Sequence, residues 1–256
     1  ETGEAEADPY MVKARRLVRD LINGELNAVY EQLSPALRDS LPYEAILTIG
    51  LQLAPYGEPG RAQVLGAAAT AVHNNVDLLV PFTAAPLKVT IRFDAEGRVD
   101  DFRIDAYAPV ETAGAPTYAD PVSFTEEEVA FGAEPWVLPG TLTLPAGEGP
   151  FPAVVLVHGS GPSDRDETAY AVKPFRDLAQ GLAAKGIATL RFDKRTYVHS
   201  QKFGSHPEFT LQEESVQDAL AAVRFLAGDK RIASDQIYVL GHSLGGLALP
   251  RILDQA

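Results

Sequence analysis

Cysteine is absent from this chain of 256 residues, which excludes disulfide bonds, thiolate metal sites and a cysteine nucleophile. Basic residues are few: 22 Lys and Arg stand against 35 Asp and Glu, so the formal net charge is −13. A chain of this charge repels nucleic acid and anionic membrane surfaces, and we expect neither as a partner. Long apolar runs are also missing, because none approaches the roughly 18 residues that a membrane span requires.

What remains is the composition of a globular protein, with a hydrophobic fraction of 46% that suffices for one large domain or two ordinary ones. The N-terminal residues do not form a signal peptide, and Glu1-Thr2-Gly3 is similar to the scar that a secretion vector leaves after signal cleavage. We therefore expect the chain to begin mature or cytosolic. The lack of cysteine fits both the cytoplasm and a bacterial exterior, and of the two we favour a secreted bacterial protein.

Helix signals dominate the first fifty residues. Asp8-Pro9, Ser34-Pro35 and Leu41-Pro42 each place proline at the start of an apolar-periodic stretch, and they predict three helices. Strand-like runs follow at residues 76–82, 87–94 and 99–107, with a hairpin turn at Ala95-Glu96-Gly97. Helices followed by an antiparallel sheet predict an α+β domain, which we place at residues 1–110.

This order of elements, together with the run VTIRFDAEGRV at residues 89–99, resembles the small cone-shaped domains related to nuclear transport factor two. Domains of that kind are found fused ahead of some bacterial serine hydrolases. The resemblance implies a cone-like N-terminal domain.

The second half of the chain has a different pattern of predicted secondary structure. Residues 111–121 are crowded with Ala, Gly, Pro and Thr, which is typical of a linker, and a second domain is expected over residues 122–256. Strand-like and helical stretches alternate there, which predicts an α/β fold with a mostly parallel sheet and flanking helices. Pro139-Gly140 predicts a bend or bulge. The expected strands cover residues 122–132, 136–144, 151–157, 187–192 and 237–240, and the helices 174–185, 211–226 and 247–253.

A serine follows the last of these strands in the frame Gly241-His242-Ser243-Leu244-Gly245. Only small residues at positions 241 and 245 allow the sharp turn from strand to helix that characterises a nucleophile elbow. Ser243 would then stand exposed at the tip of the strand. The backbone N–H of Leu244 would lie at a helix N-terminus, where unpaired donors and the helix dipole favour a developing oxyanion. The pattern indicates nucleophilic catalysis by Ser243.

Three runs in the second half are together similar to the alpha/beta-hydrolase superfamily. They are LVHGSGPSDRD at residues 156–166, RFDKR at 191–195 and GHSLGG at 241–246. Within the superfamily they are most similar to bacterial carboxylesterases with a small N-terminal domain, and next to the serine aminopeptidase group. The resemblance extends from about residue 122 to the end of the chain and implies the first half of an alpha/beta-hydrolase fold.

The resemblance also implies roles for individual residues. The backbone N–H groups of Ser160 and Leu244 would form an oxyanion hole for the nucleophile Ser243. Arg165 and Asp166 are expected to brace the loop that carries Ser160, through an ion pair or a turn. No metal and no organic cofactor is implied.

A catalytic acid and base are not apparent. In the superfamily an Asp or Glu and then a His follow the nucleophile. Only 13 residues follow Ser243, and they contain Asp254 but no histidine. We therefore expect a truncated hydrolase fold with little or no turnover. The strand at residues 237–240 would then be an unpaired edge, which predicts self-association or a missing C-terminal fragment at that edge. The upstream histidines offer poor substitutes: His158, His199, His206 and His242.

Three functions fit these observations. The leading one is hydrolysis of carboxylic esters through an acyl-enzyme on Ser243, with a small-molecule ester as substrate. A serine peptidase of the aminopeptidase type, with a peptide-like substrate, would show every one of these motifs. The third function is that of a non-catalytic binding protein on a hydrolase scaffold.

Overall fold

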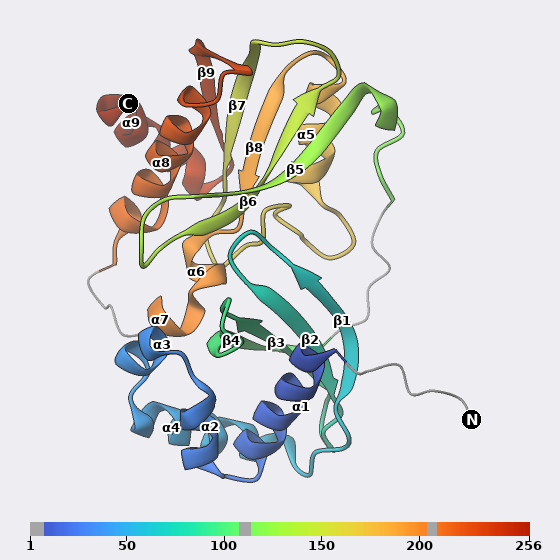
Figure 1. Ribbon diagram of the computed structural model, residues 1–256, viewed down its shortest axis with the longest axis vertical. Helices are drawn as coiled ribbons and strands as arrows, with labels where there is room; N and C mark the ends of the chain where they lie inside the picture. Colours follow the sequence, from blue (N-terminus) through green and yellow to red (C-terminus); the bar gives the residue numbers. More distant parts are fainter. Residues whose placement is uncertain (1–7, 108–113, 204–208) are drawn as a thin grey trace. The chain divides into compact units, whose positions relative to one another are not determined.

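The computed structural model describes residues 8–107, 114–203 and 209–256 (Figure 1). They form two compact units, of which the first contains residues up to 109 together with 200–207, and the second contains 110–199 and 208–256. The assignment of residues 200–207 to the first unit was not foreseen from the sequence. The boundaries at 1–110, 111–121 and 122–256 stay a prediction, and Glu1-Thr2-Gly3 and the start of the linker lie outside the described residues.

The first unit begins with four α-helices, so the prediction of three was wrong. The expected caps are present: Asp8 accepts a hydrogen bond from the backbone N–H of Tyr10 at 2.9 Å, and Ser34 Oγ accepts one from Leu37 at 3.0 Å. The missed helix, α2, has seven residues, and no side chain caps its N-terminus. It therefore lacks the capping side chain and the proline by which α1 and α3 were predicted. The helices are α1 (Pro9–Ile22), α2 (Leu26–Gln32), α3 (Pro35–Ser40) and α4 (Tyr43–Leu53).

The sheet of the first unit has four antiparallel strands in the order β1-β2-β3-β4. They are β1 (Gln63–Ala69), β2 (Asn74–Val80), β3 (Leu87–Phe93) and β4 (Val99–Ala106). The sequence did not predict β1, because its run QVLGAAA is rich in residues that strands disfavour. Leu17 of α1 and Ile46 of α4 share one core with Phe93 and Phe102. The unit is α+β, and its resemblance to the cone-shaped family stays a prediction.

A short helix at residues 200–203 completes the first unit. It is α7 (Ser200–Phe203), and two neighbouring carboxylates of β4 hold it. Lys202 Nζ lies 2.7 Å from Asp100 Oδ2, and Ser200 Oγ donates to Asp101 Oδ1 at 2.8 Å.

The second unit has a five-stranded sheet in the order β5-β6-β8-β7-β9. β5 and β6 are antiparallel, β6 and β8 are antiparallel, and β7 runs parallel to both β8 and β9. The unit is α/β, as expected, but the prediction of a mostly parallel sheet was wrong: two of the four described pairings are antiparallel, because β6 runs against both of its neighbours. The strands are β5 (Phe124–Phe131), β6 (Leu138–Pro145), β7 (Phe151–Val157), β8 (Ala188–Phe192) and β9 (Ile232–Gly241).

Helices cover both faces of this sheet. Val155 and Val157 of β7 share a core with α8 and α9, whereas Leu156 packs against α5 on the opposite face. A strand that is buried on both faces needs the continuous apolar run that β7 has. The helices of the unit are α5 (Pro174–Ala183), α6 (Arg195–Val198), α8 (Gln217–Ala227), preceded by a π-helical turn at Gln212–Val216, and α9 (Leu244–Gln255).

The bulge predicted at Pro139-Gly140 is absent. β5 and β6 pair without a break in register from Phe124↔Pro145 to Phe131↔Leu138. Gly140 serves a different purpose, because a Cβ there would lie 2.8 Å from the carbonyl oxygen of Arg191 on β8. The glycine thus permits close approach of two strands rather than a bend. In the described parts of the chain, no helix combines the length and the apolar character needed to cross a bilayer.

Candidate active site

Ser243 occupies a strained turn between β9 and α9. Its backbone has φ 49° and ψ −112°, a region that residues with a side chain rarely adopt, and its side chain is exposed. Both glycines of the frame are required by packing. A Cβ on Gly241 would overlap the backbone of Gly245, and a Cβ on Gly245 would overlap the carbonyl oxygen of Val157 at the end of β7. The turn is therefore held tightly against the neighbouring strand.

The loop that follows β7 lies against this serine. A Cβ on Gly159 would be 3.4 Å from Ser243 Cβ and 3.2 Å from His242 Nδ1. Ser160 comes next in the loop and is exposed. Within the described residues, the backbone N–H groups of Ser160 and Leu244 donate no hydrogen bond. The loops that carry the three predicted site residues are thus adjacent, as two carboxyl-terminal strand ends should be.

Glu167 joins the two loops, and no motif in the sequence points to it. Its Oε1 accepts a hydrogen bond from the backbone N–H of Gly159 at 2.7 Å and lies 2.9 Å from His242 Nδ1. The side chain of Glu167 is 12% exposed, and its backbone has a positive φ of 50°. His242 thus lies against Glu167. Glu167 is a single carboxylate in a polar loop and belongs to no motif, so the sequence does not indicate this role.

Lys194 holds the same loop by donating hydrogen bonds to two of the loop's carbonyl groups. Its Nζ donates to the carbonyl oxygen of Gly159 at 2.8 Å and to that of Gly161 at 3.1 Å, and forms an ion pair with Glu214 at 2.8 Å. Lys194 is only 2% exposed. A buried ammonium with three polar partners is satisfied, and it restrains the backbone on both sides of Ser160.

Arg165 and Asp166 brace the loop through ion pairs, as expected from the sequence. Arg165 binds Asp193 through its backbone N–H at 2.7 Å and through Nη2 at 3.0 Å. Burial opposes the charge of Arg165, but the carboxylate of Asp193 outweighs it and raises the pKa of the guanidinium. Asp166 contacts Arg191 and lies 2.9 Å from Lys173. Burial would raise the pKa of Asp166, but these two cations lower it.

The histidines of the second unit that the structure describes have other partners. His158 is buried between Phe175 and Phe192, and its Nε2 bonds to the carbonyl oxygen of Asp164 at 3.0 Å. Burial lowers the pKa of His158 and favours its neutral form. His199 Nε2 bonds to the carbonyl oxygen of Val137 at 2.9 Å. No side chain in the described part of the chain hydrogen-bonds to Ser243 Oγ, and His206 lies outside that part.

Residues 154–255 match the model of the alpha/beta hydrolase family. This part of the chain has an alpha/beta-hydrolase-like fold. The protein is also 41% identical over 175 residues to esterase EstD of Thermotoga maritima (strain ATCC 43589 / DSM 3109 / JCM 10099 / NBRC 100826 / MSB8). The matched stretch covers 68% of this chain but 40% of EstD, so the chain spans well under half of that relative.

Solved structures show more distant similarity to this alpha/beta-hydrolase-like protein. Esterase Est22 is 21% identical with a TM-score of 0.41, covering 54% of this chain and 42% of Est22. One of two prolyl endopeptidases described together is 14% identical with a TM-score of 0.44, covering 76% of this chain and 33% of the peptidase.

Proposed function

We propose that the second unit belongs to a serine hydrolase that cleaves carboxylic esters through an acyl-enzyme on Ser243. The observation that carries this proposal is the strained backbone of Ser243 at the turn from β9 to α9. Strain of this kind persists only where the surroundings enforce it, and a nucleophile elbow uses it to present the hydroxyl at the strand tip. The homologue EstD, which is named an esterase, supports ester hydrolysis over other acyl transfers.

The proposed chemistry follows from the two adjacent loops. Ser243 Oγ attacks the ester carbonyl, and the carbonyl oxygen takes up negative charge as the tetrahedral intermediate forms. The free N–H groups of Ser160 and Leu244 stabilise that charge, with Leu244 at the first position of α9, where the helix dipole adds to the effect. Each preorganised donor contributes roughly 10² to 10³ in rate. Collapse of the intermediate expels the alcohol, and water then releases the acid.

The base and its acid partner are proposed to come from residues outside those that the structure describes. His158 and His199 are held by backbone carbonyl groups, and His242 Nδ1 lies on Glu167. None of the three bonds to Ser243 in the described residues, although a serine hydroxyl needs a base within hydrogen-bond reach. Of the histidines in this sequence, His206 lies outside the described residues and stays a candidate for the base.

Active-site labelling tests the proposal. A fluorophosphonate probe should modify the full-length protein at Ser243, as located by mass spectrometry, and Ser243→Ala should abolish both labelling and hydrolysis of p-nitrophenyl acetate. Ser160→Ala is the matched control, because its backbone N–H is retained and activity should persist. Failure to label Ser243 in a folded full-length protein would refute the proposal and would favour a non-catalytic binding protein.

Substrate class is tested separately. The amine leaving group of an anilide must be protonated before it departs, whereas p-nitrophenolate departs as the anion. We expect p-nitrophenyl esters to be cleaved with kcat/KM at least ~10² above that of amino-acyl p-nitroanilides, a difference of roughly 2.7 kcal/mol in transition-state stabilisation. Preference for the anilides would instead identify a peptidase of the aminopeptidase type.

A further inference from the structure

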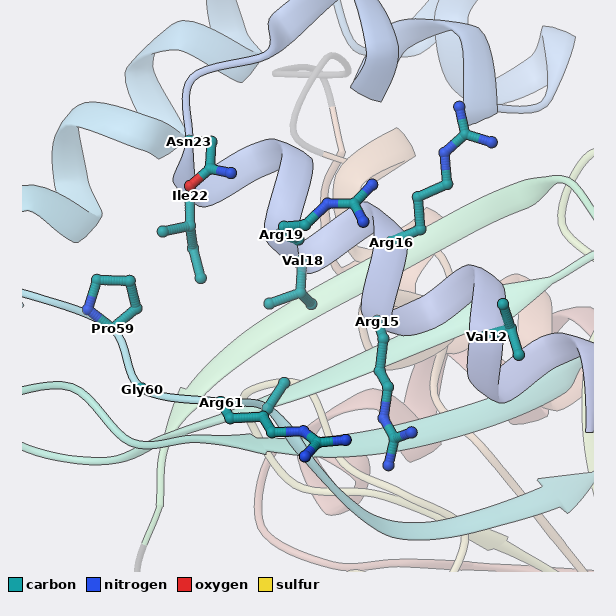
Figure 2. A pocket seen from close by; sticks show the side chains of 11 residues that line it. Val12, Arg15, Arg16, Val18, Arg19, Ile22, Asn23, Pro59, Gly60 and Arg61 are labelled. Atoms are coloured by element: carbon teal, nitrogen blue, oxygen red, sulfur yellow. The ribbon is translucent and has the colours of Figure 1, made fainter. Parts of the chain in front are cut away.

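A groove of about 570 Å³ lies in the first unit between α1 and residues 59–62 (Figure 2). This volume lies within the range of small-molecule sites in proteins. Val18 and Ile22 of α1 and Pro59 provide apolar walls. Four arginines line the same groove: Arg15, Arg16, Arg19 and Arg61.

The four arginines are not equivalent. Arg16 and Arg19 form ion pairs with Asp20 of the same helix, at 3.5 Å and 2.8 Å. Arg15 and Arg61 have no carboxylate within ion-pair distance among the described residues. Figure 2 shows their guanidinium groups extending toward the same end of the groove, whereas that of Arg16 extends away from residues 59–62. One end of an apolar groove therefore carries two cations without a counter-charge.

This arrangement is unusual for the chain as a whole, in which acidic residues outnumber basic ones by 35 to 22. Two guanidinium groups facing one space repel each other, and a bound anion would relieve that repulsion. Guanidinium forks bind carboxylate and phosphate oxygens through parallel, charge-assisted hydrogen bonds. The apolar walls would at the same time bury a hydrocarbon portion of the ligand.

We propose that this groove binds a small amphipathic anion, with its carboxylate or phosphate head at Arg15 and Arg61 and its apolar tail along Val18, Ile22 and Pro59. The head supplies the charge that the two arginines lack, and the tail supplies most of the buried area. A purely apolar ligand would leave the guanidinium groups uncompensated. A small inorganic anion would leave the apolar walls exposed to water.

Calorimetric titration of the 256-residue chain tests each part of this ligand. Decanoate and decyl phosphate carry the two possible head groups, decan-1-ol lacks the charge, and acetate lacks the tail. We expect saturable binding of at least one of the two anions, at least ten-fold weaker binding of decan-1-ol, and no measurable binding of acetate. Affinity for the anion should fall as NaCl is raised, because added ions screen the guanidinium groups.

Variants locate the site. Arg15→Gln with Arg61→Gln should weaken binding of the preferred anion by ten-fold or more, because two charge-assisted contacts are lost. Arg16→Gln is the matched control, since this neighbouring arginine pairs with Asp20 and extends elsewhere, and its affinity should stay within about two-fold. Far-UV circular dichroism melts of all variants show whether the fold is retained. The single variants Arg15→Gln and Arg61→Gln give the same test if the double variant unfolds.

Three results would overturn the proposal: absence of saturable binding by either anion, equal binding of decan-1-ol, or unchanged affinity in folded Arg15 and Arg61 variants. The proposal does not depend on Ser243. Ser243→Ala should bind the anion as the unmodified chain does, so failure of the esterase proposal and failure of this one are separable.

Discussion

Lys194 Nζ lies 2.8 Å from the carbonyl oxygen of Gly159, which belongs to the same peptide group as the N–H of Ser160. In a trans peptide the C=O and N–H bonds point in opposite directions, so a cation that fixes the carbonyl also fixes the direction of the N–H. The ammonium withdraws electron density from the amide and makes its N–H a stronger donor. Lys194 would therefore orient and strengthen one donor of the proposed oxyanion hole.

Replacing this lysine tests the relationship. Lys194→Met should lower kcat for p-nitrophenyl acetate in the full-length protein by roughly ten- to 100-fold with little change in KM, because the effect falls on charge that develops in the transition state. Glu214→Gln is the control, since it removes the ion pair but keeps the ammonium on Gly159. A Met variant that is folded and fully active would show that Lys194 has no part in catalysis.

Gly245→Ala should destabilise the second unit severely. Its Cβ would overlap the carbonyl oxygen of Val157, which is backbone in a central strand and cannot move aside. Overpacking of this kind costs about 3 kcal/mol or more, and the variant should melt at a lower temperature or fail to fold. Gly228→Ala is a matched control at the end of α8, where the nearest atom to a new Cβ is 3.5 Å away. A Gly245→Ala protein as stable as this control would contradict the observed turn.

Asp100 gives the first unit a predictable dependence on pH. Burial alone would raise its pKa, but the hydrogen bond from His73 at 2.9 Å and the ammonium of Lys202 at 2.7 Å outweigh burial and lower the pKa. A folded-state pKa below that of an unfolded aspartate, about 3.9, means that Asp100 stabilises the fold above about pH 4. That stabilisation is lost as the pH falls through the lowered folded-state pKa.

Asp100→Asn should therefore lower the free energy of unfolding at pH 7 by roughly 3 kcal/mol. The difference in unfolding free energy between the variant and the unmodified chain should become smaller as the pH is lowered below about 4. Burial raises the pKa of the neighbouring Asp101 to about 6, so the two proteins are compared below pH 4, where Asp101 is protonated in the folded state of both. Asp105→Asn is the control, because its pair with Arg103 is partly exposed. Urea unfolding at several pH values measures the difference, and a gap that is constant from pH 7 to pH 3 would disprove the assignment.

Elements with strong local signals were predictable. Asp8 and Ser34 cap two helices, and this capping pattern predicted both of them. A continuous apolar run predicted β7. Two glycines predicted the turn at Ser243, where packing leaves no room for a Cβ. Such signals depend on the chain within a few residues of the element.

The contacts that the sequence did not reveal are long-range and polar. Glu167 and Lys194 meet Gly159 only after β7, β8 and the intervening loops are in place, and neither residue belongs to a periodic pattern. The docking of α7 on Asp100 joins residues that are 102 positions apart. β1 was missed for another reason, since its alanines form a strand by pairing with β2 rather than by intrinsic preference.

β9 pairs with β7 and lies at the edge of the sheet among the described residues. Tyr238 and Leu240 on this strand are 59% and 38% exposed, and Leu247 on α9 is 71% exposed. An unpaired strand edge beside exposed apolar side chains is a template for association. We expect the 256-residue chain to self-associate in a concentration-dependent manner through this surface.

Tyr238→Lys should shift the chain toward monomer in sedimentation velocity. Val122→Lys is the control and should cause no such shift, because Val122 is an apolar residue outside this surface that is 81% exposed. A monomer at every concentration, with a cooperative melt, would show that the edge is protected.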